Sequence, residues 1–237
     1  MVKRTNEDTG FDATFTERAV FFREANALVI SDLHVGRGAG SSIDFPLGER
    51  RDLTERLDTL LDRFSPSTVV FAGDVLDAFD HVSTSVRETV SMLARAAESK
   101  ESELILIEGN HDSNLENVLE TPIHDSVTLS DGTIVCHGHV PPDERGTRYV
   151  IGHDHPAITM TGRKRPCHLV AERAFFGATV HVLPAFSRLV PGTTVNRLRG
   201  DALLTPMVDS VESCRPVVVE EGEPFAFPPL GSFRKML

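Results

Sequence analysis

The sequence has few cysteines, no tryptophan and no long apolar run. Cys136, Cys167 and Cys214 are odd in number and form no C-x-x-C pair, so we expect free thiols in a reducing compartment. No apolar run approaches the length needed to span a bilayer, and the basic residues near the N-terminus precede no apolar core that would make a secretory signal. These absences predict a cytoplasmic protein without a membrane partner.

Aromatic residues and several familiar catalytic motifs are also scarce. Aromatics make up 6% of the chain, with a single tyrosine, so a stacking platform for single-stranded nucleic acid is not evident. The chain has no P-loop, which argues against nucleoside-triphosphate motor chemistry. It has no G-x-S-x-G elbow, so serine-based acyl transfer lacks support.

The basic residues are few, and the net charge is −11. An acidic surface repels polyanions, so a polyanionic substrate would have to be met by local basic residues. Gly162-Arg163-Lys164-Arg165 is one such place. It is interpretable either as a phosphate-steering patch or as a charged hairpin turn, and the sequence leaves both open.

Strand and helix patterns alternate through the first half of the chain. Short apolar runs predict strands, two of them forming a hairpin, and leucines or valines at helical spacing predict amphipathic helices. This βαβαβ order favours a parallel sheet with helices packed on its faces. The expected strands are 19–22, 27–30, 68–72 and 104–107, and the expected helices are 53–64 and 86–97.

The second half lacks a convincing helix, and its short β-type runs predict a second, more antiparallel sheet stacked on the first. These runs are 133–136, 149–151, 168–170 and 179–183. The stretch from Pro206 is harder to assign: residues 217–219 suggest an edge strand and residues 224–237 a loosely docked tail. With 237 residues and no linker or repeat, we expect one domain over residues 1–237.

Five short polar motifs each follow the end of an expected strand. Ligands and catalytic groups of α/β proteins gather beyond the carboxyl ends of the strands, so we expect these motifs to form one cluster rather than five unrelated turns. Carboxylate or amide oxygen together with imidazole nitrogen suits Mn, Zn or Fe. The motifs are Asp32-Leu33-His34, Gly73-Asp74, Gly109-Asn110-His111-Asp112, His137-Gly138 and Gly152-His153-Asp154-His155.

This order of motifs resembles the calcineurin-like metallophosphoesterase superfamily, whose pattern is D-x-H, G-D, G-N-H-[DE], H and G-H-x-H. The resemblance implies an α/β fold of two stacked mixed β-sheets flanked by helices, a four-layer αββα sandwich. It also implies a dinuclear site with His111 as a catalytic acid. One metal ion would be bound by Asp32, His34 and His155 and the other by Asn110, His137 and His153, with Asp74 bridging the two.

Several residues around these motifs have alternative interpretations. His139 is a second candidate for the ligand role given to His137, which is closer to the strand end. Asp112 either fixes the tautomer of His111 or caps a helix over residues 113–119. Arg37 either contacts a substrate phosphate or is a solvated loop arginine.

The motifs predict a phosphoesterase. Two metal ions about 3.5–4 Å apart can activate a bridging hydroxide and stabilise an in-line displacement at phosphorus. Phosphodiesters are the favoured substrate class. A narrower resemblance is to the DNA-ligase-associated metallophosphoesterases and their archaeal relatives, which makes a nuclease acting in DNA repair an alternative. The segments that carry it are Gly152-His153-Asp154-His155-Pro156-Ala157, Pro166-Cys167 and Val182-Leu183-Pro184-Ala185-Phe186. A non-catalytic scaffold is a third hypothesis, although unused buried charges would be costly.

Overall fold

The computed structural model describes residues 3–4, 12–40, 45–77 and 82–234. Its first sheet has six strands in the order β2-β3-β4-β5-β6-β7. The predicted hairpin is present as antiparallel β3 and β4, and the predicted parallel strands follow beside it. The strands are β2 Ala13–Phe15, β3 Val20–Phe22, β4 Ala27–Ile30, β5 Thr68–Ala72, β6 Glu103–Ile107 and β7 Ile123–His124.

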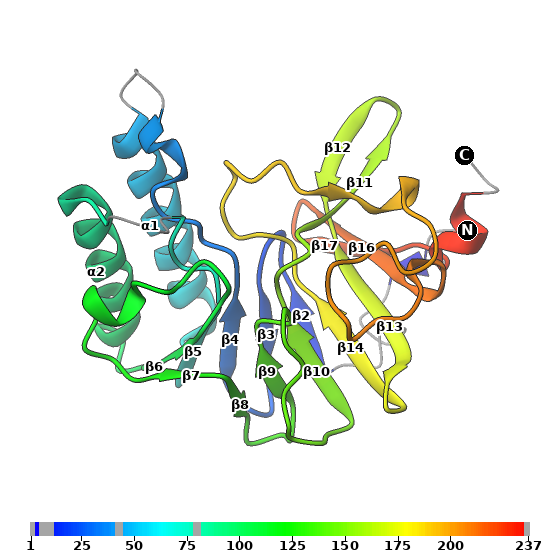
Figure 1. The fold of residues 1–237 in the computed structure, drawn as a ribbon, viewed down its shortest axis with the longest axis horizontal. Helices are drawn as coiled ribbons and strands as arrows, with labels where there is room; N and C mark the ends of the chain where they lie inside the picture. The colour runs from blue at the N-terminus through cyan, green and yellow to red at the C-terminus, as the bar shows by residue number, and fades with distance from the viewer. Residues whose placement is uncertain (1–2, 5–11, 41–44, 78–81, 235–237) are drawn as a thin grey trace.

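Helices α1 (Phe45–Phe64) and α2 (Thr84–Glu98) lie side by side against this sheet (Figure 1). Ser83 caps α2 because its hydroxyl accepts the N–H of Val86 at 3.4 Å. Leu57 on α1 and Leu93 on α2 are fully buried in one apolar cluster with strand residues. Burial of these helix faces at the predicted 3.6-residue spacing explains why both helices form here.

The second sheet has eight strands in the order β1-β17-β16-β13-β14-β10-β9-β8. Most of its pairings are antiparallel, but β10 is parallel to both β9 and β14. The predicted pair of stacked mixed sheets is therefore confirmed. Its strands are β1 Lys3–Arg4, β8 Ser126–Thr128, β9 Ile134–Cys136, β10 Arg148–Ile151, β13 His168–Phe175, β14 Ala178–Val182, β16 Arg215–Glu220 and β17 Glu223–Ala226.

The two sheets pack face to face through small and β-branched side chains. Val29 and Val70 from the first sheet share an apolar cluster with Val135, Val150 and Val170 from the second. Alternate residues of the same strands face the helices or the outer layer, so strands buried on both sides are nearly continuous apolar runs. The central cluster positions the strand ends of both sheets along a shared edge.

A third, small sheet was not predicted from the sequence. It contains β11 (Pro156–Met160), β12 (Arg163–Pro166) and β15 (Thr193–Thr194). The hairpin β11–β12 projects from the body of the molecule (Figure 1), and its turn contains Gly162 at φ +76°.

The expectation of a loosely docked tail over residues 224–237 is wrong for the described residues. Strand β17 pairs with β16, and α3 (Leu230–Phe233) follows with Leu230 fully buried. Strand β16 lies between β17 and β13, so residues 217–219 are interior to the sheet and not at its edge. Helix α3, together with 3-10 turns and loops, forms a thin outer layer over the second sheet.

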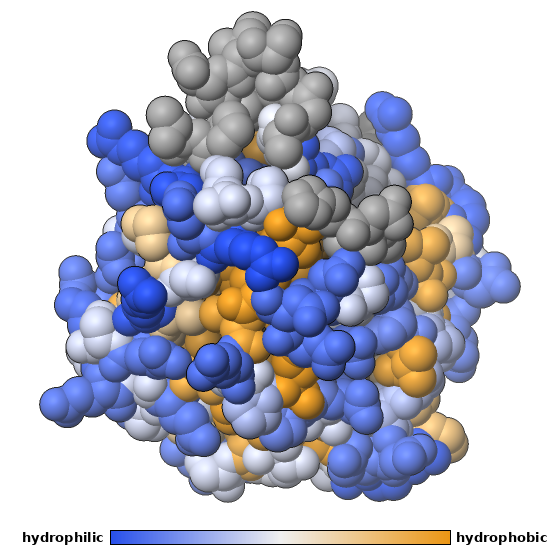
Figure 2. Space-filling view, turned by 60° about the vertical axis from the view of Figure 1, so that its left-hand side comes forward, coloured by the Kyte–Doolittle hydropathy of each residue, from blue (hydrophilic) through white to orange (hydrophobic). Residues whose placement is uncertain are grey.

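The face of the molecule drawn in Figure 2 is mainly hydrophilic. Figure 2 shows one face on which charged and polar side chains surround a central strip of apolar ones. Within the described ranges, no helix combines the length and apolar character needed to cross a membrane.

Candidate metal centre

Three of the five predicted motifs contain polar residues with strained backbone. Five of their polar residues have positive φ angles: Asp32 at 57°, His34 at 44°, Asp74 at 50°, His153 at 71° and His155 at 47°. Residues other than glycine rarely adopt this left-handed region, and such strain costs on the order of 1–3 kcal/mol per residue. The surrounding fold holds these side chains in place against that cost.

Glycines in the motifs allow the loops to approach each other closely. A Cβ atom at Gly109 would lie 2.1 Å from the backbone nitrogen of Asp74, and one at Gly73 would lie 2.4 Å from the ring of His137. At Gly152 it would lie 2.5 Å from an oxygen of Asp32. Real Cβ atoms do not come this close, so only glycine fits at these three positions.

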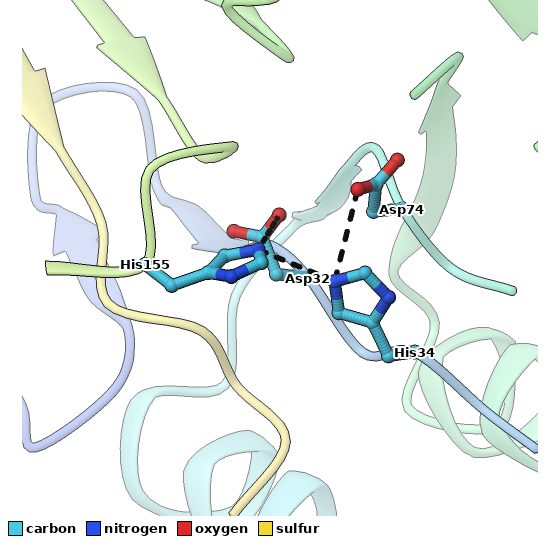
Figure 3. A group of neighbouring side chains, drawn as sticks. All are labelled: Asp32, His34, Asp74 and His155. Carbon is cyan, nitrogen blue, oxygen red and sulfur yellow. Dashed lines mark hydrogen bonds and ion pairs between the residues drawn. The ribbon is translucent and has the colours of Figure 1, made fainter. Parts of the chain in front are cut away.

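Asp32, His34, Asp74 and His155 form a first group of potential metal ligands, each offering an atom within 4.8 Å of the others (Figure 3). The Nε2 atoms of His34 and His155 are 3.2 Å apart, and Nε2 of His155 is 3.0 Å from Oδ1 of Asp32. Oδ2 of Asp74 is 3.7 Å from Nε2 of His34. Four donor atoms therefore converge on one point.

Asp74, His137 and His153 form a second group. Here Oδ1 of Asp74 is 3.3 Å from Nε2 of His137, and Oδ1 of Asn110 is 3.2 Å from the same nitrogen. The two oxygens of Asp74 thus face different groups, Oδ2 toward His34 and Oδ1 toward His137. One carboxylate is shared by both clusters.

The imidazole tautomers fit metal binding. Nδ1 of His34 donates to Oδ1 of Asp77 at 3.1 Å, and Nδ1 of His137 donates to the carbonyl of Ala72 at 3.0 Å. Each Nε2 atom then keeps its lone pair, directed at its group. Two nitrogens on one tetrahedral ion with bonds of about 2.0–2.1 Å would be about 3.3 Å apart, close to the His34–His155 separation.

The carboxylates of Asp32 and Asp74 favour the binding of cations by these ligand groups. Burial alone would raise the pKa of Asp32, but His155, His137 and His34 hold it below its usual range. Burial likewise opposes ionisation of Asp74, yet His137 and the N–H of His111 lower its pKa. Both carboxylates are 2% exposed or less. Buried carboxylate charge of this kind must be balanced, either by protonated imidazoles or by metal ions.

The family model for calcineurin-like phosphoesterases matches residues 25–166, a span that contains all five motifs. The chain belongs to this family. It is therefore a hydrolase of the metallophosphoesterase type, as its motifs predicted.

Two solved structures resemble this phosphoesterase. Nuclease MPE of Pseudomonas putida is 23% identical, with a TM-score of 0.60 over 85% of this chain and 88% of that one. Yfce, a phosphoesterase from E. coli, is 20% identical, with a TM-score of 0.39 over 67% of this chain and 77% of that one. The first likeness supports the fold. No curated protein matches significantly.

His111 lies beside both clusters of the phosphoesterase. Its Nε2 is 3.9 Å from Oδ2 of Asp74, and its Nδ1 is 3.9 Å from Oδ1 of Asp77. Its ring packs edge-on to that of His34 with centroids 5.1 Å apart. His34, Asp77 and His111 form a third close group, and the His111 side chain is 24% exposed. It is thus the more accessible of these imidazoles.

Asp112 links two motif loops. Its carboxylate accepts the N–H groups of Gly109 at 2.9 Å, Leu76 at 2.9 Å and Val75 at 3.3 Å. Burial nevertheless raises its pKa to about 6, against the effect of those N–H groups. The helix expected over residues 113–119 is reduced to a 3-10 turn, Leu115–Asn117. Asp112 holds the loop that carries Asn110 against the loop that carries Asp74.

Arg37 and His139 are the remaining sequence candidates. Nη1 of Arg37 is 3.4 Å from Oδ1 of Asp77, so Arg37 lies near the third group with its side chain 38% exposed. His139 belongs to none of the ligand groups found among the described residues, although its ring centroid is 5.2 Å from that of His137.

Sequence reasoning missed two supporting carboxylates. Glu49, buried on α1, accepts the N–H of Gly36 and so anchors the loop that follows His34. Asp154 accepts the N–H groups of Leu204 at 2.6 Å and Thr205 at 3.1 Å, tying the last motif to the C-terminal region. Glu49 gives no motif signal, and Asp154 is hidden between two candidate ligands.

Proposed function

We propose that this hydrolase uses two divalent ions, drawn from Mn, Zn and Fe, to cleave phosphodiesters. The observation that carries the proposal is the position of Asp74, whose two oxygens face two separate groups of donors. A carboxylate with this arrangement is suited to bridge two ions. When bound, the ions would supply positive charge for the phosphoryl oxygens and lower the pKa of the attacking water.

The remaining donors divide between the two ions. Asp32, His34 and His155 would hold one ion, while Asn110, His137 and His153 would hold the other. Asp77 and the Ala72 carbonyl fix the rings of His34 and His137 through their Nδ1 atoms. Asn110 would supply a neutral amide oxygen as a ligand, so the second group would bind a cation without adding negative charge that repels the substrate phosphate.

We assign His111 the role of proton donor to the leaving oxygen. Its accessible ring and its place beside Asp74 support this role. Asp112, in contrast, is proposed to act as a positioning residue, because its oxygens are used by three backbone N–H groups of the motif loops. Residues 1–237 are proposed to work as one domain.

Nucleic-acid cleavage is the second candidate function. It is favoured by the fold likeness to a protein described as a nuclease and by the motifs shared with ligase-associated relatives. The net charge of −11 opposes binding of long polyanions, so this function needs a local basic surface.

A substrate panel tests the proposed function. The purified protein with Mn is given an aryl phosphodiester, the corresponding monoester, plasmid DNA and an oligonucleotide. We expect faster hydrolysis of the diester than of the monoester. Faster hydrolysis of the monoester would overturn the assignment as a diesterase, and intact DNA after prolonged incubation would remove the nuclease function.

A further inference from the structure

Two pockets adjoin the candidate metal centre, and they carry opposite charge. One, of about 330 Å³, has His137 in its wall together with four acidic residues: Glu108, Asp125, Asp143 and Glu144. The other, of about 250 Å³, has His155 in its wall together with Arg18, Lys164 and Arg188 and no carboxylate. A substrate that extends beyond the cleaved bond therefore meets different electrostatic surroundings in the two directions.

We propose that the basic pocket binds a second phosphate group of the substrate, adjacent to the cleaved diester. This inference rests on the proposed phosphodiesterase function and names its substrate class, a short oligonucleotide or a similar diester with a further phosphate. The chain contains the basic tetrapeptide Gly162-Arg163-Lys164-Arg165, and the fold brings its Lys164 into a wall shared with His155.

The arginines around the pocket carry more positive charge than their partners neutralise. Arg18, Arg56 and Arg188 share two nearby carboxylates, those of Glu17 and Asp52. Like-charge repulsion from Arg188 lowers the pKa of Arg18, after the larger effect of burial. An anion in the pocket would relieve this repulsion.

Each cation of the pocket wall is held by neighbouring carbonyl or carboxylate groups. Nη1 of Arg18 donates to the carbonyls of Ala185 at 2.6 Å and Ser187 at 3.2 Å. Arg188 keeps a half-exposed side chain while pairing with Asp52 at 2.8 Å. Lys164 donates to the carbonyl of Gly192, and in the described part of the chain it forms no ion pair. Its charge is available to a ligand.

The uncharged part of the wall is rigid and apolar. Pro156, Pro166, Pro184 and Pro191 all line it, and proline has a fixed φ angle and no N–H to satisfy. The loop at Gly192 is fastened to the metal centre, because the N–H of Thr193 donates to the carbonyl of His155 at 2.8 Å. A nucleotide matches this wall, with phosphate at the cations and sugar against the prolines.

The test compares substrates with and without a second phosphate. The dinucleotide TpT, its 5′- and 3′-phosphorylated forms and an aryl diester are assayed with wild type, Lys164→Gln and Arg188→Gln. We expect each variant to lower the ratio of kcat/KM for the better phosphorylated dinucleotide to that for TpT roughly tenfold, through KM, as for loss of a charged hydrogen bond. Lys100→Gln and Arg51→Gln, which remove exposed cations outside both pockets, should leave the ratio as in wild type.

The outcomes separate this inference from the proposed function. An unchanged ratio in both Lys164→Gln and Arg188→Gln, or cleavage of the aryl diester but of no dinucleotide, would overturn the subsite and leave the phosphodiesterase standing. If no diester is cleaved, the proposed function fails, and a binding measurement then tests the subsite. The affinity for labelled, phosphorylated TpT, measured by fluorescence anisotropy in EDTA, should be lower in both variants than in wild type. Equal binding by wild type and variants would then overturn the subsite. Thermal melting identifies variants that fail to fold.

Discussion

At the residue scale, Asp74 connects the two halves of the candidate centre. It lies at positive φ, is 2% exposed and directs one oxygen to His34 and the other to His137. The dipeptide Gly73-Asp74 was predictable as part of a metal motif. Its sharing between two groups was predictable only through the family resemblance, because the sequence does not give the directions of the two oxygens.

Replacement of His111 should separate chemistry from metal binding. His111→Ala is expected to retain both ions and to lower kcat by about 10²–10⁴-fold, the usual contribution of a general acid. Metal analysis and steady-state kinetics on the same preparation check both parts. Loss of an ion from the variant would instead make His111 a ligand. His124→Ala, at an exposed position on β7, is the matched control and should behave as wild type.

At the element scale, the loops that follow the strands contain glycines, and the absence of a side chain at these positions lets neighbouring loops pack closely. The sequence predicted the strands β4, β5 and β6 closely, because each is a short apolar run with turn residues on either side. It did not predict β11, β12 or β15, since β12 contains Arg163-Lys164-Arg165 and β15 has two residues. Local composition carries little strand signal in β12 and β15, and the structure of both depends on their pairing with β11.

Gly109 offers a direct test of loop packing. A methyl group there would overlap the backbone of Asp74, so Gly109→Ala should lower the free energy of unfolding by about 1–3 kcal/mol or more through overpacking. Gly48→Ala in α1 meets nothing within 4 Å and should stabilise the helix by about 0.5–1 kcal/mol. Urea denaturation measures both. Equal stability of the two variants would contradict the packing argument.

At the scale of the whole molecule, the sandwich also buries polar groups that belong to none of the ligand groups found among the described residues. His168 on β13 donates through Nε2 to the carbonyl of Thr16, and its Nδ1 accepts from Nε2 of His181 at 3.0 Å. Both histidines are fully buried. Burial lowers the pKa of His168 to about 4. Neither histidine lies in one of the five motifs, and the sequence does not reveal these contacts because they join segments that are distant along the chain.

This buried pair predicts loss of stability in acid. The unfolded pKa of histidine is about 6.5, so below that pH the unfolded state binds a proton that folded His168 excludes. The free energy of unfolding should fall from pH 6.5 toward pH 4, by about 3 kcal/mol for His168 alone. Carboxyl groups titrate in the same range and also change the stability. The effect of His168 is therefore the difference between wild type and His168→Gln in how far the free energy of unfolding falls with pH.

Denaturant titrations at several pH values measure that difference. His168→Gln should lose less stability on acidification than wild type, while His124→Gln, at an exposed position, should follow the wild-type profile. Parallel profiles for wild type and His168→Gln would show that the buried ring does not resist protonation.

The metal content of the purified protein tests the central claim most directly. Elemental analysis of wild type and Asp74→Ala, after equilibration with Mn or Zn and removal of free ions, gives the number of tightly bound ions per chain. Two ions in wild type, with loss of metal and of activity together in Asp74→Ala, are expected. Fewer than one tight ion in wild type, or two ions retained by Asp74→Ala, would contradict a dinuclear centre bridged by this carboxylate.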